Sequence, residues 1–241
     1  MTQPALILHQ YQVSPFAAKV RRVCYYKDIP FETHNFGLTK LSAVKKISPS
    51  GKLPALQVGE RIIVDSTDIV AFLEEQGGNP VFPADPARRA QAHIIEDWAD
   101  ESLYFYDLAM RTWPHNVALL AEDLTLEESG FMKSLFRRVI PGAILKQAKG
   151  QGIARKSPEE VCRDVERHFD AIVALLEDSE FLVGSQRSIA DIAGVSMCTV
   201  LDRAKEASDM MAARPLLLAW RERVDGLTLP AGTAPGDRAL V

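Results

Sequence analysis

The chain has 241 residues, of which 47% are hydrophobic and 25% are charged, and its formal net charge is −4. This length suits two moderate domains, and the composition is that of a globular protein rather than a disordered or fibrous one. The small acidic excess argues against a general nucleic-acid binder, which carries an excess of basic residues.

The first 80 residues alternate strand and helix patterns. The apolar run ALILH predicts a short buried strand, and apolar residues at helical spacing after Ser14-Pro15 predict a helix from Ser14 to about Lys27. FETHNF predicts a second strand that ends at Gly37, and LSAVKKI predicts a short helix. Two apolar runs around a Gly-Glu turn, LPALQV and RIIV, predict a β-hairpin, and a helix opens at DSTDIV. The order βαβ, ββ, α indicates a small mixed sheet covered by helices.

The rest of the chain shows helix patterns only. The proline-rich stretch NPVFPADP predicts a linker at 80–85, between an α/β domain at 1–79 and an all-α domain at 86–229. Pro141-Gly142 is predicted to kink or end its helix, and Ser188 with Asp191 forms a capping-box pattern. About five helices are expected in all. The first starts at Asp85-Pro86, and the others cover about 127–149, 158–178, 189–206 and 214–225.

The distribution of cysteines indicates a reducing compartment. Cys24, Cys162 and Cys198 lie far apart, without a C-x-x-C or zinc spacing, and the five histidines show no metal spacing either. The start MTQPALILHQ lacks the basic region of a signal peptide, and no apolar run reaches the roughly 18 residues of a membrane span. We therefore expect a cytoplasmic protein with no metal and no membrane partner.

Ser14 allows two interpretations. Serine before proline is a common helix start, because its side chain accepts a hydrogen bond from a free N–H group of the first turn. A helix N-terminus also offers N–H donors and a positive dipole end, so Ser14 could instead hold a negatively charged group.

The order of several short motifs resembles the glutathione transferases. SPF stands at the first helix start, GKLP stands before the hairpin, and the pair DS opens the next helix. A proline-rich link and helices with an S-x-x-D box follow, and the SPFAAKV segment is most similar to the tau and omega classes. The resemblance implies a thioredoxin-like N-terminal domain that binds glutathione, an all-helical C-terminal domain with the second-substrate pocket, and a homodimer.

The resemblance also assigns roles to residues. Ser14 matches the catalytic position that activates the glutathione thiol. Leu53 matches the residue whose backbone pairs with the cysteinyl part of glutathione, and Pro54 matches the cis-proline that follows it. Asp65 and Ser66 match the pair that holds the γ-glutamyl end, although the family usually has glutamate where this chain has Asp65.

Two lysines match the glycyl end of glutathione. Lys40 falls where a lysine meets the glycyl carboxylate in tau and omega proteins, and Lys52 is a second candidate. Glutathione has two carboxylates, an amine and a thiol, so binding it requires an extended backbone edge, a cation and acceptors for the amine. The assigned residues supply all three from loops at one end of a sheet.

Several alternatives stay open. Tyr11 is the rival to Ser14, because other classes of the family use a tyrosine near the end of the first strand. Tyr11, Tyr104 and Tyr106 are candidates for the second-substrate pocket, which would take an apolar electrophile. The expected activity is transfer of glutathione as co-substrate to that electrophile, with isomerase, dehalogenase, peroxidase or ether-cleaving chemistry as variants. A non-catalytic binding protein of the same fold is the other class of function.

Overall fold

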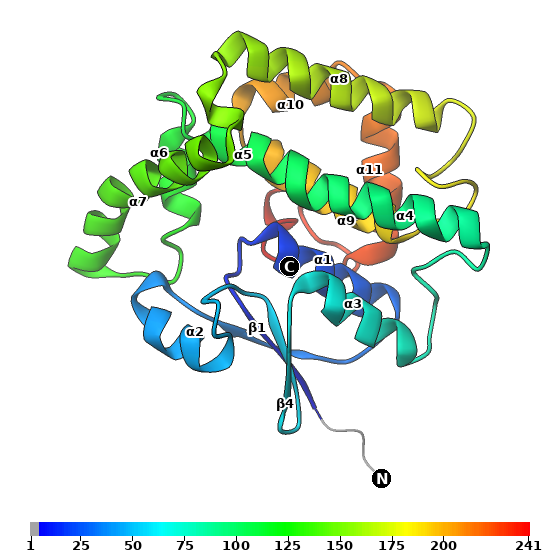
Figure 1. Ribbon diagram of the computed structural model, residues 1–241, viewed down its shortest axis with the longest axis horizontal. Helices are drawn as coiled ribbons and strands as arrows, with labels where there is room; N and C mark the ends of the chain where they lie inside the picture. Colours follow the sequence, from blue (N-terminus) through cyan, green and yellow to red (C-terminus); the bar gives the residue numbers. More distant parts are fainter. Residues whose placement is uncertain (1–4) are drawn as a thin grey trace.

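A four-stranded mixed sheet forms the centre of the N-terminal domain in the computed structural model, which describes residues 5–241 (Figure 1). The strands lie in the order β2-β1-β3-β4, with β1 and β2 parallel and the other pairs antiparallel. The second strand ends at Asn35, two residues earlier than predicted. The elements are β1 (Leu6–Gln10), α1 (Pro15–Tyr26), β2 (Glu32–Asn35), a 3₁₀ turn (Leu38–Lys40), α2 (Leu41–Ile47), β3 (Ala55–Val58), β4 (Arg61–Val64) and α3 (Ser66–Glu75).

Four loops meet at one end of this sheet, where strands end or begin; we call this end the sheet edge. The register pairs Gln10 with Asn35, and it aligns Ala55 with both His9 and Val64. Strands β1, β2 and β4 therefore end, and β3 begins, at the same edge. The segments beside these strand ends, 11–14, 36–40, 52–54 and 65–66, carry every residue assigned to glutathione from the sequence.

The rest of the described chain is helical apart from a short bridge between Phe181 and Gly184. This arrangement confirms the predicted α/β plus all-α class. There are more helices than the five or so predicted. A π-helical segment divides the first one, the helix expected over 189–206 is interrupted, and the helix at Val117–Asp123 lies where none was predicted. The helices are α4 (Pro86–Trp98), a π-helical segment (Ala99–Leu103), α5 (Tyr104–Arg111), α6 (Val117–Asp123), α7 (Gly130–Gln151), α8 (Pro158–Leu176), α9 (Ile189–Leu201), α10 (Lys205–Ala212) and α11 (Pro215–Thr228).

One predicted helix end is wrong, and one of two predicted outcomes at Pro141 is excluded. The helix expected over 189–206 ends at Leu201, and α10 begins at Lys205, whose backbone N–H donates to the Asn116 side chain at 3.1 Å. That distant partner, which the local sequence does not show, satisfies the N–H at the start of the new helix. Of the predicted kink or end at Pro141, the structure excludes the end, because α7 continues through this residue although proline removes one backbone donor.

Helix α9 is the centre of the helical domain. All 13 of its residues are buried, and it packs against α1, α4, α5 and α11. The capping box predicted at its start is present, since the Ser188 backbone N–H donates to Asp191 Oδ2 at 2.8 Å. The contact between α1 and α9 places the first helix of the sheet domain directly on this core.

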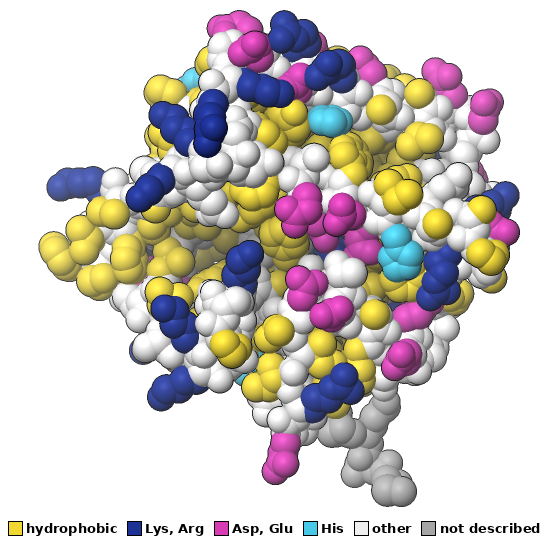
Figure 2. All heavy atoms as spheres, in the orientation of Figure 1, with side chains coloured by type: hydrophobic (Ala, Val, Ile, Leu, Met, Phe, Trp, Pro, Cys, Tyr) yellow, Lys and Arg dark blue, Asp and Glu magenta, His cyan; other side chains and the backbone are white. Residues whose placement is uncertain are grey.

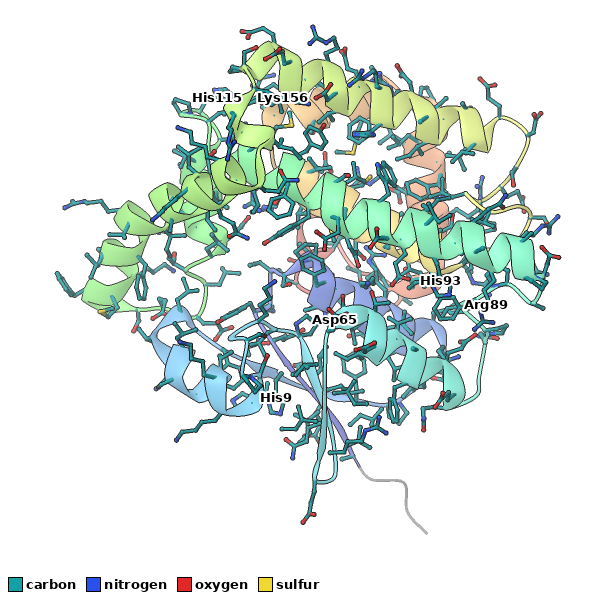
Figure 3. The ribbon with its side chains drawn as sticks, viewed as in Figure 1. His9, Asp65, Arg89, His93, His115 and Lys156 are labelled. Carbon is teal, nitrogen blue, oxygen red and sulfur yellow. The ribbon has the colours of Figure 1, made fainter. Side chains whose placement is uncertain are left out.

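The proline-rich linker is fixed between the two domains. The Phe82 ring stacks on His93 at 4.7 Å, and the Arg89 guanidinium lies over the same ring at 4.9 Å. Figure 3 shows His93 and Arg89 side by side on α4. The backbone N–H groups of Val81 and Phe82 both donate to the Glu74 carboxylate of α3. The linker therefore ties α3 to α4.

Within residues 5–241, none of the helices combines the length and the apolar character needed to cross a membrane. The expectation about a signal peptide rests in part on residues 1–4, which lie outside the described residues.

Candidate functional site

Ser14 lies at the start of α1 with its hydroxyl proton available. Its backbone is extended, and Pro15 occupies the first helical position, as predicted for a helix start. The Ser14 Oγ accepts a long hydrogen bond of 3.4 Å from the Ala17 backbone N–H. No hydrogen bond donated by this hydroxyl occurs among residues 5–241. A half-buried hydroxyl at a helix N-terminus can therefore donate to a negatively charged atom that binds at this helix end.

Tyr11 is the first residue of the same loop, directly after β1. It packs against the cluster of Phe36, Val44, Leu53 and Ala55, and burial raises the pKa of its hydroxyl. Its backbone carbonyl accepts the Ser14 N–H at 3.0 Å. Tyr11 thus stays protonated at neutral pH and remains the rival to Ser14 as a donor.

The Leu53–Pro54 peptide bond is cis, as the resemblance implies, and it lies beside the end of β1. Leu53 and Pro54 are both buried. This loop directly precedes β3, whose first residue, Ala55, pairs with His9. The Leu53 backbone is therefore located at the edge where Ser14 also lies.

Asp65 begins α3 in an unusual backbone conformation. Its φ angle is +77°, and its side chain accepts the Thr67 backbone N–H at 2.9 Å. Positive φ is uncommon outside glycine, and such residues cost about 1–3 kcal/mol and cluster at functional sites. Asp65 is exposed and Ser66 is buried, so the carboxylate faces solvent at the sheet edge (Figure 3).

A buried ion network lies behind Asp65, and the sequence analysis missed it. Lys19 Nζ is fully buried and donates to Asp100 Oδ2 at 2.5 Å, to Glu96 Oε1 at 2.9 Å and to Thr67 Oγ1 at 3.3 Å. Burial raises the pKa of Asp100 to about 6, against the attraction of Lys19. This network joins α1, α3 and the helical domain. Lys19 is 48 to 81 residues from its three partners in the chain, so no local pattern reveals the network.

The two candidate lysines are both exposed. Lys40 ends the 3₁₀ turn that follows β2, and Lys52 precedes the cis bond. They lie on two different loops of the same sheet edge. Either ammonium group is free to move toward a carboxylate bound there.

Of the other two tyrosines proposed for the second-substrate pocket, one lies near Ser14. The Tyr104 ring packs edge-on against Phe16 of α1, with 4.8 Å between the ring centroids. Burial raises the pKa of Tyr104 to about 12. Tyr106 instead turns toward α8, where its hydroxyl donates to Asp164 at 3.2 Å. Residues two positions apart on a helix point to different sides, so Tyr106 faces a different side from Tyr104, and its place in the second-substrate pocket stays a prediction.

A hollow separates α7 from the region of α2, and Figure 2 shows hydrophobic side chains around it on the left of the molecule. The exposed apolar residues of α7 follow one stripe at four-residue spacing, Phe131, Leu135 and Val139. On α2, Leu41 is also exposed. This apolar surface borders the sheet edge that carries the glutathione candidates.

Two further cavities lie away from this edge. One of about 440 Å³ lies at the starts of β1 and β2, and one of about 480 Å³ lies between α6, α9, α10 and α11. Neither is lined by a residue assigned to glutathione. Among residues 5–241 no three metal-ligating side chains gather in one place.

Comparison with known proteins agrees with this arrangement. Residues 8–80 match the family described as "Glutathione S-transferase, N-terminal domain", and residues 133–227 match "Glutathione S-transferase, C-terminal domain". Protein LigF of Sphingobium sp. strain SYK-6 is 28% identical to the chain over 238 residues, which cover 91% of this chain and 90% of LigF. The isoprene-epoxide–glutathione S-transferase of Rhodococcus sp. strain AD45 is 24% identical, covering 88% of this chain and 91% of that protein.

Solved structures show the same fold. The beta-etherase LigF from Sphingobium sp. strain SYK-6 superposes with a TM-score of 0.68 at 25% identity, covering 97% of this chain and 98% of LigF. A tau class glutathione S-transferase from mango, Mangifera indica, gives a TM-score of 0.64 at 19% identity, covering 98% and 96% of the two chains. The chain therefore belongs to the glutathione S-transferase family, and its relatives support a glutathione-dependent activity.

Proposed function

We propose that the chain binds glutathione across the sheet edge and that Ser14 activates its thiol for attack on an apolar electrophile. The observation that carries this proposal is the Ser14 hydroxyl, which stands at the N-terminus of α1 with its proton free. Leu53 would pair with the cysteinyl backbone, and Asp65 with Ser66 would hold the γ-glutamyl end. Lys40 and Lys52 would meet the glycyl carboxylate.

The physical basis is the ionisation of a thiol. A free thiol has a pKa of about 8.5, so only a few per cent is thiolate at pH 7, and the thiolate is the nucleophile. A hydrogen bond to a charged acceptor is worth about 1.5–3 kcal/mol, and a helix N-terminus adds about 0.3–1 kcal/mol. At 1.36 kcal/mol per pKa unit, the two together lower the thiol pKa by roughly 1.5–3 units. Bound glutathione would then be mostly thiolate at neutral pH.

The names of two relatives suggest the class of electrophile. One is a beta-etherase and the other an isoprene-epoxide–glutathione S-transferase, so both names refer to substrates with a carbon–oxygen bond. For this chain we propose attack of the thiolate on a carbon that bears such an oxygen. A carbon–sulfur bond forms, the carbon–oxygen bond breaks with its electron pair on oxygen, and that oxygen then takes a proton. Tyr104, Phe16 and the apolar residues of α7 would bind the hydrocarbon part.

Two assays test the proposed function. We expect the protein to be retained on immobilised glutathione, and to form thioethers from a panel that contains aryl ethers, epoxides and alkyl halides. Retention without turnover of any panel member would instead identify a binding protein. Failure on both counts would contradict the proposal.

We expect Lys40→Ala and Ser66→Ala to weaken glutathione binding with little effect on chemistry. Both residues would act at the ends of glutathione, far from sulfur. The binding free energy of their contacts is therefore the same in the ground state and in the transition state. Loss of a charged hydrogen bond corresponds to a rise in KM for glutathione of about tenfold or more, with kcat near that of wild type. Steady-state kinetics at saturating electrophile gives both constants. A large fall in kcat at saturating glutathione would show that these residues are misplaced.

We also propose that the protein is a homodimer. Apolar side chains are exposed on both domains, with Ile62 and Val64 on β4 and Ile94 on α4, in agreement with a partner that covers them. Light scattering at micromolar concentration should give twice the mass of one chain. The mass of a single chain would refute the dimer.

A further inference from the structure

The loop between α6 and α7 reaches across to the loop between β2 and α2. Glu128 Oε1 accepts the Thr39 backbone N–H at 3.0 Å, and the Thr39 hydroxyl lies 3.3 and 3.4 Å from the two carboxylate oxygens. Beside it, Glu127 Oε1 accepts the Asn35 amide at 3.3 Å. We call the contact between Glu128 and the segment 37–39 the latch.

The latch is closely packed. Glu128 is 7% exposed, although glutamate is almost never buried without partners. A Cβ on Gly37 would lie 2.6 Å from Glu128 Oε1. The Gly37 backbone is extended, with φ −83° and ψ 162°, so any residue could adopt its conformation. A side chain at position 37 would therefore displace the Glu128 carboxylate from its place on the turn.

Both ends of the latch lead to the candidate site. Thr39 directly precedes Lys40, in the 3₁₀ turn that carries this lysine. Asn35 also accepts a hydrogen bond of 2.9 Å from Gln10, at the end of β1 before Ser14. On the other side, Glu128 directly precedes Ser129, the N-cap of α7. The latch thus connects the start of α7, which borders the hollow, to the loop proposed for the glycyl end of glutathione.

We propose that Glu128 is a positioning residue. It holds the loop that carries Lys40 against the loop that precedes α7, so that the site for the glycyl end of glutathione and the hollow beside α7 form one rigid unit. This inference rests on the proposed function, because it assumes that Lys40 meets glutathione. The carboxylate caps the free N–H at the start of the 3₁₀ turn and thereby fixes where the turn presents Lys40. The loop between α6 and α7 would then shape both binding steps.

The test breaks the latch from each side. Glu128→Ala removes the carboxylate, and Gly37→Ala pushes a methyl group against it while leaving all charges in place. The matched control is Glu122→Ala, which removes an exposed carboxylate of α6. Within residues 5–241 this carboxylate has one salt bridge, to Arg137 of α7 at 3.7 Å. We expect both latch variants to raise KM for glutathione about tenfold, the cost of one charged hydrogen bond, while the control stays at the wild-type value. The kcat at saturating glutathione and electrophile should change far less.

The double variant and hydrogen exchange separate positioning from stability. In Gly37→Ala/Glu128→Ala the clash is gone, so KM should be no higher than in Glu128→Ala alone. The Thr39 amide should exchange faster in both single variants than in wild type. If the latch variants bind glutathione as tightly as the control, the positioning role of Glu128 is wrong, whatever their melting temperature. The proposed function would not be affected by that result. If the wild-type protein itself does not bind glutathione, the proposed function fails and the role of Glu128 fails with it.

Discussion

Ser14→Ala is expected to raise the pKa seen in the pH profile of kcat/KM by one unit or more. The variant loses the hydroxyl that would donate to the thiolate, a hydrogen bond worth about 1.5–3 kcal/mol, or about 1–2 pKa units. Fewer bound thiols are then ionised at neutral pH, so kcat/KM at pH 7 should fall several-fold. Glutathione affinity should stay nearly unchanged, because the other contacts remain.

The control for this experiment is Ser157→Ala. Ser157 also precedes a proline at a helix start and accepts the Glu160 backbone N–H at 3.3 Å, but it begins α8 in the helical domain. Its variant loses a helix cap and should keep the wild-type pH profile. Ser14→Cys should exchange conjugation for thiol–disulfide exchange, because a thiol of low pKa at a helix start forms mixed disulfides. If Ser14→Ala behaves as wild type and Tyr11→Phe is inactive, Tyr11 activates the thiol and Ser14 is only a cap.

Asp191→Ala is expected to destabilise the fold by about 3–5 kcal/mol. A helix cap by itself predicts about 0.5–2 kcal/mol. The structure raises this value, because Asp191 Oδ1 accepts the Leu182 backbone N–H and the Trp220 indole N–H, both at 2.9 Å. With the Ser188 N–H, three buried donors would lose their acceptor, and each unsatisfied buried group costs about 1–3 kcal/mol.

Denaturant unfolding measures this loss, with Asp85→Ala as the matched control. Asp85 caps α4 through a single hydrogen bond of 2.9 Å to the exposed Arg88 N–H, so its removal should cost about 1 kcal/mol. Activity per folded Asp191→Ala molecule should equal that of wild type. A loss of stability no larger than that of the Asp85→Ala control would show that the buried donors find other partners.

The local helix and turn signals were reliable where one short segment contains all the partners. Ser14 and Asp85 cap their helices, and the Ser188–Asp191 box forms as predicted. The hairpin turn also lies where the sequence predicted it, between Val58 and Arg61. In these cases the hydrogen bonds join residues two to four positions apart, so the sequence alone contains the whole interaction.

The sequence by itself determined the order of strands and helices, the edge at which the glutathione candidates meet and the place of Ser14 at a helix start. Only the tertiary structure decided the interruption after Leu201, the direction of Tyr106, the Lys19 network and the contact between Glu128 and Gly37. Each of these depends on a partner brought close by the packing of distant segments, as with Glu128 and Thr39, 89 residues apart. Such pairs leave no periodic signal in the chain, because a buried charge or a close approach is fixed by the three-dimensional path rather than by neighbouring residues.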